Sequence, residues 1–359
     1  MRIKLMYYEI YKVLFSYKII WLIMAFLLIK TAVVCILPEL RDPRIKISKN
    51  QYDKVLEEVA GETSPKKEQY IFETNEHYLS TLNKYQDNLN LYLAGKIDED
   101  VWKDYTNEYN EAKLYGNAFS MLNEKAEAFV SFRTSYDSDL PLQAYFYEYG
   151  WHSVFIYMSF PDPILCIFAL IIGIQFICPE ISSGSMQVIL TSKKGRRSLF
   201  ITKLISLFIL LGSTAIINII IELVVFYSRF YLKEGHWPLY SITLFISNPI
   251  KLNLYQALAL LMVIRHMGFI FTGLFAFCIA GLTENASHGM FISILLILLP
   301  WLLIPDIPFT ISAWLSGTPV LKVSYRITPL IVLIVTLIIT TWIFYYKKFL
   351  LRKIIIHKN

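Results

Sequence analysis

The sequence lacks the short motifs that mark many enzyme active sites. It contains no G-x-x-x-x-G-K-[ST] phosphate-binding loop, no H-E-x-x-H zinc pair and no G-x-S-x-G serine elbow. The six histidines are scattered and none lies in a carboxylate cluster suited to zinc. We therefore expect that the chain is not an enzyme and binds no metal.

Cysteine is scarce. The four cysteines, Cys35, Cys166, Cys178 and Cys278, all lie in or at the ends of apolar runs, and residues 38–153 contain none. Their spacing matches neither a disulfide framework nor a metal site. We interpret them as small buried apolar side chains.

Charge is also scarce and is distributed unevenly. Only 17% of the 359 residues are charged, 55% are hydrophobic, and the mean hydropathy of +0.48 indicates a polytopic membrane protein. Residues 38–153 carry 21 acidic and 13 basic side chains, whereas the rest of the chain carries 7 and 21. The positive-inside rule explains the basic remainder better than nucleic-acid binding does.

The apolar runs predict an all-α protein with six transmembrane helices. About 20 residues cross a bilayer, and the runs are close to this length except the third and fourth, which are longer. The expected spans are residues 19–37, 160–178, 199–227, 254–282, 289–304 and 329–346. We interpret the first span as uncleaved. Four basic residues precede it and place the N-terminus in the cytoplasm, and an even number of spans places the C-terminus on the same side. Residues 1–18 alternate apolar and basic residues, which favours an interfacial elbow helix, with an ordinary basic flank as the alternative.

Residues 38–153 form a soluble insert between the first two spans, and we expect it to be extracellular. Two apolar runs with helical spacing predict an antiparallel helical hairpin. The first contains Tyr78, Leu82, Tyr85, Leu89 and Tyr92, and the second contains Phe119, Leu122, Ala126 and Phe129. Gly95 and Asp98 favour a turn and a helix start between them. Residues 134–153 are rich in aromatic side chains, as is typical of an outer membrane interface.

The short segment after the second span carries the most distinctive pattern in the chain. Residues 179–205 read PEISSGSMQVILTSKKGRRSLFITKLI, and four of their basic residues fall within five positions. Such a loop faces the cytoplasm. Glu180 lies at the end of one span, and Gly184 follows four residues later. A short amphipathic stretch and the basic cluster come next, and Lys203 lies at the start of the next span.

This pattern resembles the first cytoplasmic loop of type-2 ABC exporter permeases, although Lys193 stands where that family often has proline. The resemblance implies that residues 179–198 form a cytoplasmic coupling loop, in which a short amphipathic helix from Ser185 to Leu190 docks on a separate ATPase subunit. The residues that it assigns to coupling are Glu180, Gly184, Met186, Leu190, Arg196, Arg197 and Lys203. It further implies that ATP and Mg bind to that partner, that no cofactor binds to this chain, and that two permease chains pair, identical or related. The alternative is that the basic cluster only sets topology.

Charged residues inside the spans are a second group of candidates, because burial of charge in a bilayer is costly. Glu222 lies in the third span, and Arg265 and His266 lie in the fourth. We expect them to line the outer half of a transport path and to pair there. A purely structural ion pair is the alternative. Lys30, inside the first span, is expected to reach a membrane surface or face other helices.

Together these features predict three parts: residues 1–37 as elbow helix and first span, 38–153 as extracellular helical domain, and 154–359 as spans two to six. The expected function is the membrane-spanning permease subunit of an ABC exporter in a bacterial plasma membrane. Its cargo is expected to be amphipathic or peptide-like. The alternative is a non-transporting sensor or interaction module whose outer hairpin binds a ligand.

Overall fold

The computed structural model describes residues 2–40, 49–136, 140–183, 195–247, 250–283 and 285–303. The chain divides into two compact units, which we describe separately. The first unit contains residues 1–37, 154–231 and 258–359, and the second contains residues 38–153 and 232–257. The second unit therefore adds a segment from the third interhelical loop to the predicted insert.

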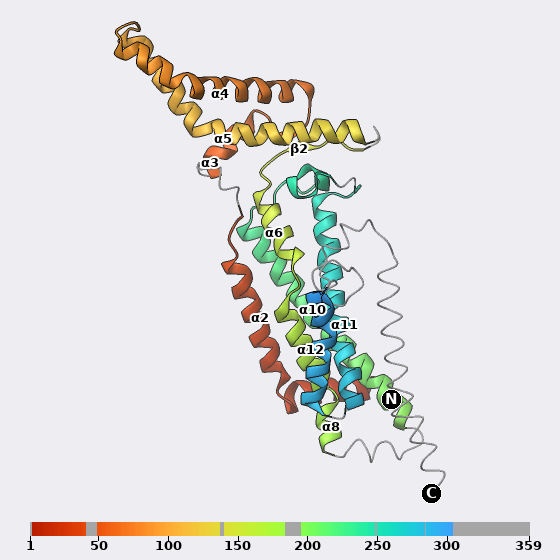
Figure 1. The fold of residues 1–359 in the computed structure, drawn as a ribbon. Helices are drawn as coiled ribbons and strands as arrows, with labels where there is room; N and C mark the ends of the chain where they lie inside the picture. The colour runs from red at the N-terminus through yellow and green to blue at the C-terminus, as the bar shows by residue number, and fades with distance from the viewer. Residues whose placement is uncertain are drawn as a thin grey trace. The chain divides into compact units, whose positions relative to one another are not determined.

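The first unit is built from long apolar helices (Figure 1). Four of them are long and apolar enough to cross a membrane: Ile19–Ile36, Pro163–Ser182, Phe200–Arg229 and Leu254–Thr283. The corresponding elements are α2 (Ile19–Ile36), α7 (Pro163–Gln175) with α8 (Cys178–Ser182), α10 (Gly195–Arg229) and α11 (Leu254–Thr283). The predicted fifth span falls on α12 (Ala286–Leu303), and the sixth lies outside the described residues. The helical membrane class is confirmed, and the number of six stays a prediction.

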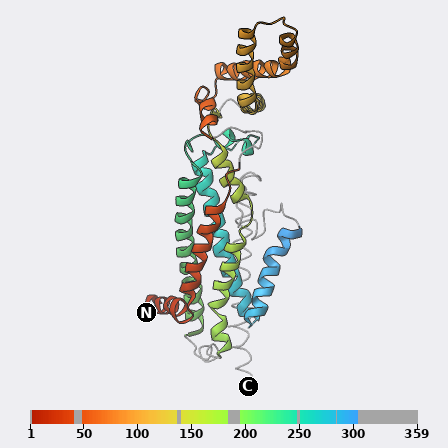
Figure 2. The same ribbon diagram turned by 90° about the vertical axis from the view of Figure 1, so that its left-hand side faces the viewer.

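The N-terminal segment forms α1 (Arg2–Tyr11), which continues as the π-helical turn η1 (Lys12–Ser16). The chain then reverses at Lys18, whose φ of 57° is left-handed, before α2 begins. Figure 2 shows α1 lying at a steep angle to α2. Glu9 and Val13 are buried, so this segment is packed against the helices and does not extend freely from them.

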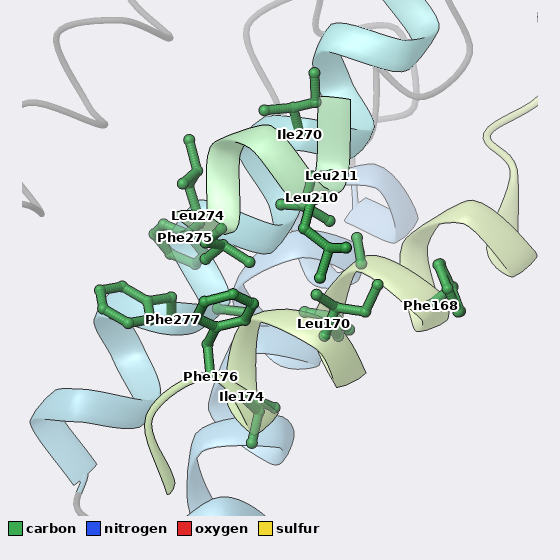
Figure 3. Packing of buried hydrophobic residues seen from close by; sticks show 14 of the residues in the cluster. Phe168, Leu170, Ile174, Phe176, Leu210, Leu211, Ile270, Leu274, Phe275 and Phe277 are labelled. Carbon is green, nitrogen blue, oxygen red and sulfur yellow. The ribbon is translucent and has the colours of Figure 1, made fainter. Parts of the chain in front are cut away.

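The core of the first unit lies between α2, α7, α10 and α11. Figure 3 shows the part of it that α7, α10 and α11 contribute. The Phe26 ring stacks on Phe168 with a centroid distance of 4.1 Å. Glycine allows the closest approach: a Cβ atom on Gly173 would lie 2.2 Å from the Gly273 carbonyl oxygen. Small residues at such crossings are typical of membrane helix pairs, because the backbones can then pack directly.

The second unit is dominated by a helical hairpin. Its helices are α4 (Pro65–Leu93) and α5 (Glu99–Ser135), which lie side by side (Figure 1). Gly95 has a φ of 69° in the turn, and Asp98 is the residue before α5, although its side chain makes no capping hydrogen bond. Aromatic rings join the helices: Tyr85 stacks on Tyr109 at 3.7 Å.

Smaller elements complete the second unit. They are α3 (Lys49–Glu57), β1 (Gly61–Glu62), β2 (Ala144–Tyr145), α6 (Tyr149–Ser159, whose first five residues belong here), η2 (Leu239–Ser241) and η3 (Thr243–Phe245). The strands pair antiparallel with Gly61 opposite Tyr145. The aromatic segment before the second span is packed here: Tyr145, Phe146 and Trp151 are buried. The expected place of this segment at an outer membrane interface is therefore wrong for these three residues, which are core residues of the unit.

Candidate functional site

Four charged side chains meet in the interior of the first unit, and we call them the membrane charge cluster. Each comes from a different helix or its cap, and each is at most 4% exposed. They are Lys30 on α2, Asp162 before α7, Glu222 on α10 and Arg265 on α11. Two positive and two negative charges balance, which reduces the cost of burial.

The cluster is a chain of ion pairs. Lys30 Nζ lies 2.9 Å from Glu222 Oε1 and also contacts Asp162 Oδ2. Arg265 Nη2 donates to the same Asp162 oxygen at 2.7 Å. Glu222 and Arg265 therefore lie in one cluster, as expected. Among the described contacts, however, Glu222 pairs with Lys30 and Arg265 pairs with Asp162.

Tyr157 on α6 covers the two cations. Its hydroxyl accepts a hydrogen bond from Lys30 Nζ at 2.6 Å, and its ring centroid lies 4.5 Å from the Arg265 guanidinium carbon. Cations over aromatic faces are attracted by the ring quadrupole, more strongly where water is excluded. The ring therefore contributes to holding Lys30 and Arg265 in place.

Asp162 is the member of the cluster that sequence reasoning missed. Its Oδ1 caps α7 by accepting from the backbone N–H groups of Ile164 and Leu165, both at 3.0 Å, which leaves Oδ2 for the cations. Pro163 occupies the first turn, where a missing N–H is tolerated. An aspartate followed by proline at the start of an apolar run is a helix-start signal, and that signal could have identified Asp162.

His266 lies beside the cluster and pairs with a different residue. Its Nε2 is 2.9 Å from Asn218 Nδ2, and its Nδ1 is 2.8 Å from the Met262 carbonyl oxygen. Asn218 and Glu222 are four residues apart on α10, so they share a face of that helix. The three expected path residues thus lie in one region of the first unit.

A second group of charges, the elbow cluster, surrounds Glu180. Lys203 Nζ on α10 donates to Glu180 Oε1 at 2.7 Å and to Glu9 Oε2 on α1 at 2.8 Å, and Lys12 also contacts Glu180. Burial lowers the pKa of Lys12, but the hydrogen bond and charge of Glu180 raise it, and the net direction is upward. Lys12 therefore stays charged, and α1, η1, α8 and α10 are tied together.

For the other residues assigned to coupling, the structure does not describe the side chains. Gly184, Met186 and Leu190 lie outside the described residues. Arg196 and Arg197 lie at the start of α10, but their side chains also lie outside what the structure describes. Of the seven, only Glu180 and Lys203 are seen to meet. In the described part of the chain, no group of three or more His, Cys, Asp or Glu side chains could hold a metal ion.

Comparison with known families identifies the class. Residues 11–342 match the model of the ABC-2 family transporter proteins, so the match covers nearly the whole chain. The chain belongs to this family, and the resemblance inferred from the cytoplasmic loop is confirmed. It is a multi-pass membrane protein of a family that supplies the membrane component of ABC transporters. Neither the curated proteins nor the solved structures gave a match.

Proposed function

We propose that the chain is the permease subunit of an ABC exporter in a bacterial plasma membrane. In this proposal both termini and residues 179–198 face the cytoplasm, and residues 38–153 are extracellular. A separate ATPase subunit binds ATP and Mg, and a second permease chain completes the transporter. The cargo is amphipathic or peptide-like.

The elbow cluster is the observation that carries this proposal. Glu180 lies in the proposed coupling loop, ahead of its short helix, and its buried carboxylate is bonded to Lys203 on α10 and to Lys12 on η1. A push on the loop by the ATPase would therefore move α10 and the N-terminal helix together. A flexible loop that only set topology would need no such buried attachment.

Substitution of Glu180 by Gln tests the attachment. The chain would be co-expressed with its neighbouring genes, purified in mild detergent, and assayed for co-elution and activity of the ATPase. We expect the ATPase to co-elute with the wild type and to lose substrate or lipid stimulation in the variant. Glu39→Gln, in the second unit, is the control. An ATPase that never co-elutes would contradict the proposal.

We also propose that Glu222, Arg265 and His266 line the transport path, with the membrane charge cluster as its closed state. The cluster joins four helices, so relative movement of any two must break an ion pair. Glu222→Gln removes one charge but keeps the shape of the side chain. We expect transport into inverted vesicles to fall while the variant still assembles with the ATPase, and unchanged transport would contradict a path role.

One observation favours the alternative of a ligand-binding module. The hairpin of the second unit carries an open cavity of ≈ 440 Å³. Its lining is aromatic and acidic: Tyr70, Glu73, Thr74, His77, Tyr78, Glu108 and Glu111. Such a lining suits a cationic group. If no ATPase bound to the chain and deletion of the hairpin abolished a cellular response, this alternative would replace the export proposal.

A further inference from the structure

The pairing of His266 with Asn218 is not explained by a role in lining a path. Both side chains are at most 2% exposed. The two ring nitrogens have fixed partners: Nδ1 faces the Met262 carbonyl and Nε2 faces the Asn218 amide nitrogen. These partners define the protonation state of the ring.

A carbonyl oxygen can only accept a hydrogen bond, so His266 Nδ1 carries a hydrogen. An amide NH₂ group can only donate, so Nε2 carries a lone pair. The ring in this structure is therefore neutral, with its free lone pair directed at Asn218. Because the Nδ1 hydrogen is held by the backbone, the ring can gain a proton only at Nε2.

Two buried acceptors nearby have no hydrogen-bond partner among the described residues. They are Asn218 Oδ1 and Glu222 Oε2. Both belong to α10, one helical turn apart, where side chains approach each other to about 5–6 Å between Cβ atoms. Buried polar atoms without partners are rare and call for an explanation.

We propose that His266 is a proton-binding site in the membrane domain and that the Asn218 amide turns to admit the proton. A proton from water forms an N–H bond at the Nε2 lone pair, no covalent bond within the protein breaks, and the hydrogen bond from the Asn218 NH₂ group to Nε2 is lost. The Asn218 NH₂ group would then face a second donor. If the Asn218 amide rotates by about 180°, its oxygen Oδ1 takes the place of the NH₂ group and accepts from the new N–H group. The two ends of an amide have similar shapes, but the oxygen accepts hydrogen bonds and the nitrogen donates them.

The same rotation releases the Asn218 NH₂ group from His266. In the proposal this group then donates to Glu222 Oε2, one turn further along α10. Both acceptors that lack partners around the neutral ring would then gain one when the ring is charged.

The charges around the ring act in opposite directions. Burial in the apolar interior opposes a charged ring first of all, and the cations Arg265 and Lys30 add to this, whereas the Glu222 carboxylate favours it. Asp162 and Tyr157 complete the set of titratable groups in the cluster. Proton binding changes the cluster from balanced to a net charge of +1, and it gives Glu222 partners that compete with Lys30.

The proton would therefore weaken the attachment of α2 to α10. This inference goes beyond the proposed export function, because it adds a proton as a ligand of the membrane domain. It does not require the ATPase or a known cargo, so it can fail or succeed independently of that proposal.

The test is a histidine titration of the full chain in detergent micelles. The protein would be labelled with ¹⁵N at its histidine rings, and the ring nitrogen resonances followed from pH 8 to pH 5. His266→Gln assigns the signal, and the other five histidines are internal references. We expect His266 to carry its hydrogen on Nδ1 at pH 8 and to take up one proton within this range.

Two variants test the amide. Asn218→Leu cannot accept a hydrogen bond, so the His266 midpoint should move to lower pH by about one unit, a tenfold weaker proton affinity. Asn218→Asp offers a fixed acceptor and should move it to higher pH by a similar amount. A His266 ring that stays neutral down to pH 5 in the folded wild type would overturn the proposal. So would a midpoint that ignores both substitutions.

Discussion

The two units of this chain bury polar and aromatic groups by different rules. The first unit encloses charged side chains in ion pairs, among them the balanced membrane charge cluster, and brings helices together at glycines. The second unit joins its two long helices through stacked aromatic rings and leaves most of its charges exposed.

The difference follows from the solvent that each unit is built for. In a bilayer, lipid tails are as apolar as leucine, so apolar burial does little to choose helix partners, and close packing and polar contacts do so instead. In water, burial of aromatic rings stabilises a hairpin directly. The most sensitive positions should therefore be small or charged in one unit and aromatic in the other.

The largest effect is expected at the glycine contact of the first unit. Gly173→Leu would drive side-chain atoms into the Gly273 backbone, where even a Cβ atom would lie at 2.2 Å. Backbone atoms cannot move aside as the end of a flexible side chain can. We therefore expect that the variant does not fold and that size-exclusion chromatography shows no monodisperse peak. Gly212→Leu is the matched control, because a Cβ atom there meets nothing within 4 Å. Equal behaviour of the two variants would show that the contact does not decide packing.

The next effect is expected in the membrane charge cluster. Asp162→Asn removes the acid that Lys30 and Arg265 share, and breaking a buried ion pair typically costs about 3–5 kcal/mol. Thermal unfolding in detergent measures the loss. Adding Arg265→Met restores charge balance, so the double variant should lose less than the sum of the two single variants. Simple additivity would mean that the pair is not coupled.

A smaller effect is expected in the aromatic hairpin. Trp102 stacks on Tyr92 with a centroid distance of 5.0 Å and is only half-buried. Trp102→Ala should therefore lower the free energy of unfolding by about 2 kcal/mol, which is less than the loss expected for a fully buried ring. Trp102→Phe should lower it clearly less than Trp102→Ala does. Hydrogen exchange along α4 and α5 is the measurement. If Trp102→Ala leaves exchange in both helices unchanged, stacking is not what holds the hairpin.

The smallest effect concerns alkaline pH. Burial raises the pKa of Tyr240 to about 12, above the value near 10 for an exposed tyrosine. The neutral phenol therefore contributes to the free energy of unfolding, and this contribution is complete below pH 10. It is lost as the pH rises towards 12, and the loss is about 1.4 kcal/mol at pH 11. Tyr240→Phe should remove this part of the pH dependence. Melting temperatures at pH 8 and pH 11 test it, and an unchanged difference in the variant would contradict the assignment.

Much of the architecture could be predicted from sequence. Hydropathy alone located the four spans that the structure describes, because an uninterrupted run of about 20 apolar residues is typical of a transmembrane helix. Residue spacing located the two long helices of the second unit. The aromatic segment at residues 134–153 was misread, because an aromatic side chain that suits a membrane interface also suits a folded core.

The candidate site was only partly predictable. Glu222, Arg265 and His266 were identified because charge inside an apolar run is costly. Their partners were not, because pairing depends on which faces of four helices meet. Asp162 was missed since, in the sequence, it lies at the end of a span and not inside one.

The sequence by itself determined the class of protein, the positions of the described spans and the residues whose burial demands an explanation, because these follow from composition and periodicity along one chain. The tertiary structure alone decided that Lys30 lies between Glu222 and Asp162, that Lys203 joins Glu9 to Glu180, and that His266 faces Asn218. Those contacts join residues that are 23 to 194 positions apart. Which residues meet over such separations is set by how helices rotate and pack against one another, and no local pattern in the sequence specifies it.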